Sequence, residues 1–135
     1  MNTLMGIDYG DRRIGIAFSS SSLASSYETY VRKDELTDLN YLKRLIIENK
    51  VTKVIFGLPL NMDGTEGERA FVTREFAKKL YDLTQVEFDF QDERLTSVEA
   101  EEILIEMGVK RDKRKLLIDK ICARIILQTY IDKKK

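Results

Sequence analysis

Apolar and polar positions alternate in several short stretches of the chain, with the period of about two residues that is typical of β-strands. A turn-rich segment, Tyr9-Gly10-Asp11-Arg12, separates the first two stretches and predicts a hairpin between them. Three of the stretches lie in the first third of the chain, and two shorter apolar runs follow later. The pattern predicts five strands, at Leu4–Tyr9, Arg13–Ser19, Tyr27–Val31, Lys53–Phe56 and Val86–Phe90.

Apolar residues spaced three and four apart predict helices between and after the later strands. The expected helices run from about Thr37 to Lys50, Glu66 to Leu83, Ala100 to Met107 and Leu116 to Ile131. Gly108 is expected to end the third helix, and the basic run Lys110–Lys115 is expected to be a loop. Residues that can cap a helix precede the first three: Asp34 or Thr37, the pair Thr65 and Glu68, and the pair Thr96 and Glu99.

This order of elements predicts an α/β fold with one mixed five-stranded sheet. The first three strands would be antiparallel and the last two parallel, with helices on both faces, in a single domain that spans residues 1–135. In such sheets ligands bind at the carboxyl ends of the parallel strands. Candidate chemistry is therefore sought at those ends.

Composition narrows the class of protein. With 135 residues, 43% of them hydrophobic, the chain is long enough to bury a core without disulfides or a structural metal. The single cysteine, Cys122, has no partner in the chain, and no apolar stretch approaches the roughly 18 to 20 residues of a membrane span. The first residues also lack the features of a secretory signal. We therefore expect a cytoplasmic protein with no membrane partner.

Charge and histidine content exclude some chemistry. The chain has no histidine, so hydrolytic chemistry would depend on carboxylates, hydroxyls, lysine or a bound ion. Its 23 basic and 23 acidic residues give no net charge, and a nucleic-acid function would need an uneven distribution of charge. Acids gather at residues 87–93 and 99–106, whereas bases gather at residues 110–115 and at the carboxyl-terminal end.

Three carboxylates are candidates for a site. Asp8 ends the first strand between Gly6 and Gly10, although an aspartate there could simply form the turn. An acid after the fifth strand is a second candidate, but spacing does not choose Glu93 over Asp92, and both could belong to a solvated loop.

The third candidate, Asp119, lies on the apolar stripe of the last helix, too far inside the helix to be a cap. A carboxylate there needs an arginine partner or a cation. If the three carboxylates converged, their mutual repulsion would favour divalent cations. An all-oxygen site without histidine suits Mg²⁺ or Mn²⁺ rather than zinc. Two such ions can hydrolyse a phosphodiester bond without an imidazole.

Four segments resemble the YqgF-type family. They are residues 5–17 (MGIDYGDRRIGIA), 57–65 (GLPLNMDGT), 92–97 (DERLTS), and 118–119 with Ala123. Cys122 departs from the family, which more often has alanine there. The resemblance covers nearly the whole chain and implies a ribonuclease H-like fold. It also implies that the catalytic and metal-binding residues are Asp8, Glu93 and Asp119, which selects Glu93 over Asp92.

The same resemblance implies an activity on nucleic acid. The family is described both as Holliday junction resolvases and as nucleases that act on precursor 16S ribosomal RNA. The leading prediction is a metal-dependent endonuclease that trims the 5′ end of precursor 16S rRNA, with RNA as partner. Substrate contacts are expected from basic residues, which could otherwise be an exposed turn and a solvated loop: Arg12, Arg13, Lys110, Arg111, Lys113, Arg114 and Lys115. The helix after Thr65 could also seat a phosphate, but its own acids favour a capping role.

Three alternatives stay open. A resolvase would act on branched, four-way DNA and would need a dimer, whereas the sequence shows no obvious dimer face, so we expect a monomer or a weak homodimer. A noncatalytic nucleic-acid-binding or ribosome-assembly module would use the carboxylates only for structure. The string from Gly6 to Gly10 also resembles the first phosphate loop of actin-like and sugar-kinase ATPases, but those proteins need two such domains.

Overall fold

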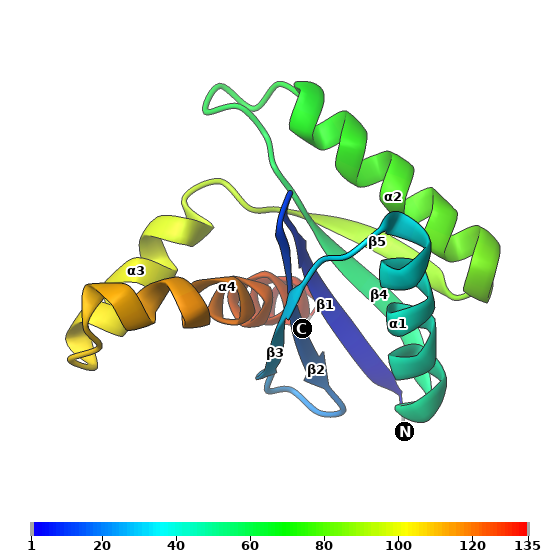
Figure 1. Ribbon diagram of the computed structural model, residues 1–135, viewed down its shortest axis with the longest axis horizontal. Helices are drawn as coiled ribbons and strands as arrows, with labels where there is room; N and C mark the ends of the chain where they lie inside the picture. Colours follow the sequence, from blue (N-terminus) through cyan, green and yellow to red (C-terminus); the bar gives the residue numbers. More distant parts are fainter. Residues whose placement is uncertain (1, 135) are drawn as a thin grey trace.

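The computed structural model describes residues 2–134 and consists of one sheet covered by helices (Figure 1). The strands are β1 (Thr3–Tyr9), β2 (Arg13–Ser19), β3 (Ser25–Val31), β4 (Val51–Leu58) and β5 (Glu87–Asp92). The helices are α1 (Glu35–Glu48), α2 (Glu68–Thr84), α3 (Thr96–Glu106) and α4 (Arg111–Lys133). All nine expected elements are therefore present among these residues, with bounds that differ by a few residues from those expected.

The sheet has the order β3-β2-β1-β4-β5. The pairs β1–β2 and β2–β3 are antiparallel, whereas β1–β4 and β4–β5 are parallel. This confirms the expected mixed sheet with an antiparallel first half. The carboxyl ends of β1, β4 and β5 meet at one edge, from which the loops to α2 and α3 leave (Figure 1).

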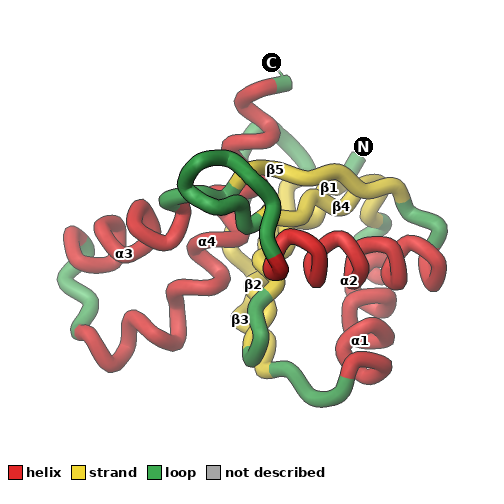
Figure 2. The backbone as a smooth tube through the Cα atoms, turned by 90° about the horizontal axis from the view of Figure 1, so that it is seen from above, coloured by secondary structure: helices red, strands yellow, loops and turns green. Residues whose placement is uncertain are grey.

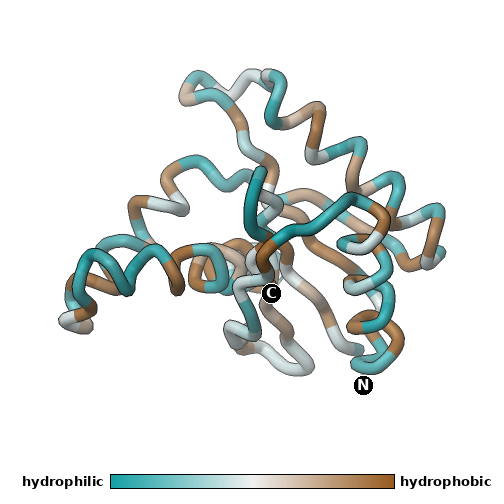
Figure 3. Tube along the Cα trace, in the orientation of Figure 1, coloured by the Kyte–Doolittle hydropathy of each residue, from teal (hydrophilic) through white to brown (hydrophobic). Residues whose placement is uncertain are grey.

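The two faces of the sheet carry separate apolar clusters. In β4, Val54 and Phe56 belong to the cluster under α1 and α2, whereas Ile55 between them belongs to the cluster under α4. This period of two is the pattern of a strand that is buried on both faces. Apolar positions accordingly concentrate in the central strands, and hydrophilic ones along the outer parts of the helices (Figure 3).

Glycines let α4 lie very close to the sheet. A Cβ atom on Gly15 would lie 1.9 Å from the backbone oxygen of Asp119, and one on Gly6 would lie 2.8 Å from Cβ of Leu127. Both distances are far below van der Waals contact. The absence of side chains at these two positions therefore sets the distance between α4 and the strands β1 and β2.

The helix starts differ from the expected capping. Asp34 does cap α1, where its Oδ1 accepts a hydrogen bond of 2.8 Å from the amide of Thr37. The capping box of Thr65 and Glu68 is wrong, because α2 begins at Glu68 itself after Gly67, without a side-chain cap. The hydroxyl of Thr65 donates instead to Asp63, at 2.6 Å, within the tight loop before the helix.

The second capping box is wrong for a different reason. Leu95, the residue before α3, has a left-handed backbone (φ 65°), and no side chain caps the helix. The amide of Thr96 donates to the carbonyl oxygen of Glu93, so Thr96 is already the first helical residue, and it is buried. Its hydroxyl therefore does not serve as the cap that the sequence spacing predicted.

The basic run at residues 110–115 is not a loop, because α4 begins at Arg111. Lysine and arginine favour helices, and the acidic helix α3 lies alongside: Nε of Arg114 is 2.8 Å from Oε1 of Glu101. The start of α4 and the whole of α3 project beyond the sheet as an arm (Figures 1 and 2). In residues 2–134, no helix combines the length and the apolar character needed to cross a membrane.

Candidate active site

The geometry around Asp8 follows from two glycines on the neighbouring strands. Asp8 lies near the end of β1 and pairs with Gly15 of β2, directly under the backbone of Asp119 in α4. On the other side, Ile7 pairs with Phe56 of β4, so that Gly57 comes next to Asp8. The missing side chains at the two glycines leave room for groups from α4 and from the end of β5.

Glu93 occupies the room beside Gly57. It follows β5, and its amide donates to the carbonyl oxygen of Leu58 at 3.2 Å, which continues the pairing of the two strands. A Cβ atom on Gly57 would lie 3.0 Å from the carboxyl group of Glu93. The glycine therefore allows this carboxyl group to lie across the end of β4 toward Asp8.

The three expected acids line one cavity of about 430 Å³ at this edge of the sheet. Asp8, Glu93 and Asp119 come from a strand end, a loop and a helix. The other charged residues in the lining are Asp11, Arg69 of α2 and Arg94. A larger cavity, of about 640 Å³, lies between β3 and α1, but its acid, Glu28, is bonded to the hydroxyl of Tyr41. Only the first of these two cavities gathers carboxylates.

Asp8 and Glu93 are both half-buried, and each carboxyl group affects the pKa of the other. Burial raises the pKa of Asp8, and repulsion from Asp119 adds to this effect. Burial also raises the pKa of Glu93, and repulsion from Asp8 adds to it. The contact between the two carboxyl groups raises the pKa of Glu93 and lowers that of Asp8, so Glu93 holds a proton more readily than Asp8 does.

Asp119 lies in the same cavity but bonds to a basic side chain. Its Oδ2 is 2.6 Å from Nε of Arg13, and 19% of its side chain is exposed. The expectation that a carboxylate on this helix face needs a partner is confirmed, and in the structure the partner is an arginine. Within residues 2–134, no three histidine, cysteine, aspartate or glutamate side chains already form a cluster that could hold a metal ion.

None of the expected basic residues lines the cavity, although Arg13 bonds to Asp119. Arg12 is exposed in the turn between β1 and β2. The basic run at residues 110–115 lies at the start of α4, on the arm that projects from the sheet (Figure 2). The structure therefore brings Arg13 to the acids and leaves the run at the start of α4 at a distance from them.

Arg69 is a charged residue of the cavity that the sequence did not reveal. It belongs to the first turn of α2 and donates through Nη2 to the carbonyl oxygen of Tyr9 at 3.0 Å, and through Nη1 to Asp11. Its positive charge lowers the pKa of both Asp8 and Glu93. A signal was present, because a basic residue in the first turn opposes the helix dipole and so points to another role.

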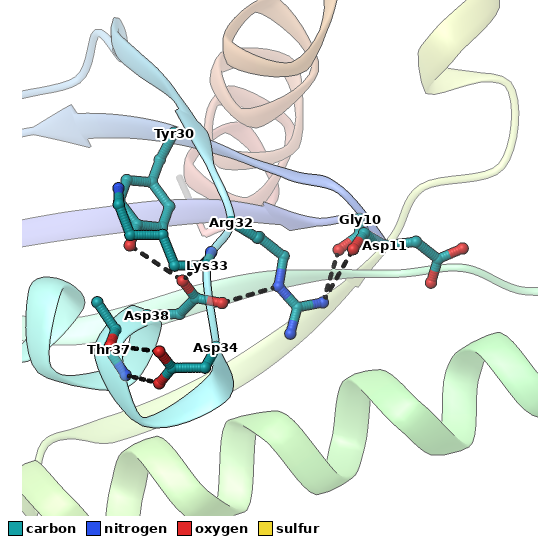
Figure 4. Close-up of polar contacts among 8 residues, drawn as sticks. All are labelled: Gly10, Asp11, Tyr30, Arg32, Lys33, Asp34, Thr37 and Asp38. Carbon is teal, nitrogen blue, oxygen red and sulfur yellow. Dashed lines mark hydrogen bonds and ion pairs between the residues drawn. The ribbon is translucent and has the colours of Figure 1, made fainter.

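A buried ion pair braces the turn that follows Asp8 (Figure 4). Asp38 of α1 is fully buried and accepts from Nε of Arg32 at 2.9 Å and from the hydroxyl of Tyr30 at 3.0 Å. Arg32 donates in turn to the carbonyl oxygen of Gly10 at 3.1 Å. The hairpin next to Asp8 is thereby tied to α1, which limits how far this side of the cavity can move.

Comparison with known proteins places this arrangement in a family. The family described as "RuvX: Holliday junction resolvase" matches residues 2–133. A protein of Syntrophomonas wolfei named "Putative pre-16S rRNA nuclease" is 47% identical over 131 residues, which cover 96% of this chain and 93% of the relative. A protein of the same name from Halothermothrix orenii is also 47% identical over 131 residues, covering 96% of this chain and 94% of the relative.

Solved structures that resemble this one are more distant in sequence. RuvC of T. thermophilus in complex with a Holliday junction substrate has a TM-score of 0.63 at 12% identity, covering 99% of this chain and 96% of that one. The Fowlpox virus resolvase in complex with Holliday junction DNA has a TM-score of 0.62 at 10% identity, covering 98% of each chain. These similarities confirm the expected ribonuclease H-like fold.

Proposed function

The chain belongs to the RuvX family, and on that basis we propose that it is a metal-dependent endonuclease that trims the 5′ end of precursor 16S rRNA. One observation carries the catalytic part of this proposal. Asp8, Glu93 and Asp119 line one cavity at the carboxyl ends of parallel strands, where the pKa values of Asp8 and Glu93 are both raised. A structural role would not require three carboxyl groups to line one cavity.

The donor set suits Mg²⁺ or Mn²⁺. All three acids offer oxygen atoms only, and the raised pKa values of Asp8 and Glu93 indicate that their negative charges lack compensation in the cavity. When bound, such ions lower the pKa of an attacking water and stabilise the leaving oxygen of a phosphodiester. We assign Asp8, Glu93 and Asp119 as the residues that would hold them and that are catalytic.

The chain's own residues set the conditions for loading the site. Gly15 fixes the backbone of Asp119 against β2, so only the side chain of Asp119 can change partner. In the structure that side chain bonds to Arg13. We propose that Asp119 exchanges this arginine for a cation, which leaves Arg13 free to bind a phosphate of the substrate.

Substrate binding is proposed to extend beyond the cavity. Arg69 would contact a phosphate oxygen at the cavity, and Arg12 would contact the backbone from the hairpin. The basic start of α4, which includes Lys110, Arg111, Lys113, Arg114 and Lys115, would contact more distant phosphates along the arm. Such contacts position a nucleic acid without reading its sequence.

The assignment of precursor rRNA rests on relatives that are 47% identical over nearly their whole length. An activity of this kind belongs in the cytoplasm, where ribosomes are assembled. The alternative substrate is four-way DNA, which the description of the family and the two junction-bound structures support. That alternative would require two copies of the chain to cut two strands, whereas trimming one RNA strand needs only one.

The test compares both substrates directly. End-labelled precursor 16S rRNA and a four-way DNA junction would be incubated with the purified protein in Mg²⁺ or Mn²⁺, and the cuts mapped. Asp8→Asn, Glu93→Gln and Asp119→Asn should each lower the rate by at least about 100-fold. Glu48→Gln, which removes an exposed acid at the end of α1, is the matched control and should cut normally.

Three outcomes would contradict parts of the proposal. Full activity in all three acid variants would refute the assigned site. Cleavage of the DNA junction but not of the RNA would transfer the function to the resolvase alternative. RNA binding without cleavage under any metal condition would favour the noncatalytic module.

A further inference from the structure

Two large apolar side chains are exposed at the mouth of the catalytic cavity. Met62 lies in the loop between β4 and α2 and is 67% exposed, and Leu95 lies between β5 and α3 and is 56% exposed. Both line the cavity that contains Asp8, Glu93 and Asp119. We call Met62 and Leu95 the apolar rim.

The apolar rim is held in place by hydrogen bonds. In the loop that carries Met62, the amide of Asn61 donates to the carbonyl oxygen of Thr65 and the amide of Gly64 donates to that of Asn61, both at 2.8 Å. Nη1 of Arg94 donates to the carbonyl oxygen of Met62 at 3.1 Å, which ties the loop to the segment that carries Leu95. Exposure of the two side chains is therefore a fixed feature of this edge.

Arg94 is itself fixed by the residue that precedes Glu93. Its backbone amide and its Nε each donate to the carboxylate of Asp92 at 2.9 Å. One side chain thus links the end of β5, the segment after Glu93 and the loop after β4. The distance between the apolar rim and Glu93 is set by these bonds.

Stability does not explain Leu95. Its backbone is left-handed, with φ 65°. This conformation is unfavourable for residues that have a Cβ atom, and asparagine tolerates it best among them. Its side chain is exposed next to a site of charged groups, where a polar residue would be better solvated. An exposed leucine in a strained backbone beside Glu93 is expected where function needs an apolar surface.

The chemistry of a nucleic acid identifies what such a surface contacts. Phosphates and sugar hydroxyls are polar and gain nothing from methionine or leucine. The faces of the bases are apolar, but in a duplex each face is stacked on its neighbours. Apolar side chains reach a base face only where the base is unstacked, in a single strand, a bulge or a wedged step.

We propose that Met62 and Leu95 bind the face of an unstacked base next to the cleaved phosphate, so that the enzyme selects unpaired nucleotides. This inference rests on the proposed nuclease function and adds a structural class of substrate to it. The carboxylate cavity would act on the backbone, whereas the apolar rim would decide where along the backbone it acts. Paired segments would bind through their phosphates but would be cut slowly.

Three oligonucleotides of one sequence test this selection: a single strand, a perfect duplex, and a duplex with one bulged nucleotide. The parent should show a kcat/KM on the single strand and the bulge at least about tenfold above that on the duplex. The double variant Met62→Gln, Leu95→Asn should lose about tenfold on the first two, mainly through KM, and keep its duplex rate. Asparagine tolerates the left-handed backbone, so the variant should unfold at the parent's temperature.

Met107→Gln is the matched control, because Met107 is equally exposed, at 69%, at the far end of α3. It should leave all three rates unchanged. Equal rates of the parent on the single strand and the duplex would overturn the inference. An equal loss of rate on the single strand and on the duplex in the double variant would also overturn the inference.

A binding measurement separates this inference from the nuclease proposal. A 2-aminopurine base placed in the single strand changes its fluorescence when it contacts an apolar surface, and it can be titrated with the Asp8→Asn protein in Mg²⁺. A fluorescence change that Met62→Gln, Leu95→Asn abolishes would support the apolar rim even if the parent cut no substrate. The absence of any change with Asp8→Asn alone would overturn the apolar rim even if the parent were a nuclease.

Discussion

Gly15→Ala should damage both the stability and the activity of this protein, because α4 rests directly on Gly15. The added Cβ would lie 1.9 Å from the backbone oxygen of Asp119 and 2.4 Å from its carbonyl carbon. Ordinary contact begins at 3.4 Å, so the two backbones must separate by about 1.5 Å. Neither neighbour is the flexible end of a side chain that could turn away.

The movement would fall on α4. Gly15 lies in β2, which is hydrogen-bonded to β1 on one side and β3 on the other, so the strand is held within the sheet. Lifting α4 opens the cluster that includes Ile55, Ile126 and Leu127, which are almost fully buried. Forced overpacking of this kind costs about 1–3 kcal/mol, and a backbone clash without relief belongs at the upper end, near 3 kcal/mol.

Activity should fall by more than the loss of stability explains. Asp119, which we propose to be catalytic, moves with α4, and a displacement of about 1 Å at a catalytic group can cost about 100-fold in rate. Urea unfolding and cleavage of a single-stranded oligonucleotide in Mn²⁺ would measure the two effects separately.

Gly108→Ala is the control for Gly15→Ala. A Cβ there meets nothing within 4 Å, although φ is +75°, so a loss of about 1 kcal/mol from backbone strain alone is expected, with normal activity. If Gly15→Ala were as stable as Gly108→Ala and fully active, the inferred close packing of α4 on Gly15 would be refuted.

Three further predictions concern charged groups. Burial and repulsion from Asp8 raise the pKa of Glu93 above its usual 4.5. Above pH 4.5 the folded metal-free protein therefore keeps a proton that the unfolded chain loses. Its free energy of unfolding should fall as the pH rises from about 4.5 into the alkaline range. Glu93→Gln should remove most of that slope in urea titrations with EDTA, and an unchanged slope would contradict the raised pKa of Glu93. Asp38→Ala should cost about 3–5 kcal/mol in the same assay, because it leaves Arg32 without its buried partner, and a loss below about 1 kcal/mol would refute this role. Lys113→Ala should weaken RNA binding and reduce the slope of log K against log salt concentration by about 0.7, whereas an unchanged slope would mean that the start of α4 does not touch phosphate.

Local periodicity was sufficient to predict the architecture, because it reflects burial directly. The apolar run in β4 and the helical stripe through Ile126 identified elements that the structure contains, and their order predicted the mixed sheet. The helix starts were harder, because a cap depends on competing hydrogen bonds. The hydroxyl of Thr65 is bonded to Asp63 in its loop. Thr96 is the first helical residue because Leu95 before it has a left-handed backbone, a conformation that residue propensities do not predict for leucine.

The site was predictable only in part for a similar reason. Asp119 could be recognised as a carboxylate on an apolar face, since that is a property of one helix. Its bond to Arg13 joins residues that are 106 positions apart, and Arg69 reaches Tyr9 across 60 positions. Contacts between residues so far apart in the chain depend on how α2 and α4 lie on the sheet. The local sequence around each residue does not predict them.

The arginines around the cavity explain how a chain without net charge can bind a polyanion selectively. Arg13 bonds to Asp119, Arg69 to Asp11 and Arg94 to Asp92, so each of these cations already has a carboxylate partner. A phosphate approaching the metal-free site would have to displace those partners while facing the acids of the cavity. Cations bound by the acids would remove the repulsion and at the same time release Arg13, so metal and substrate should each strengthen the binding of the other. Tight binding would then be confined to complexes in which the acids already hold cations. This would protect a cell's other RNA from a nuclease that makes few sequence-specific contacts.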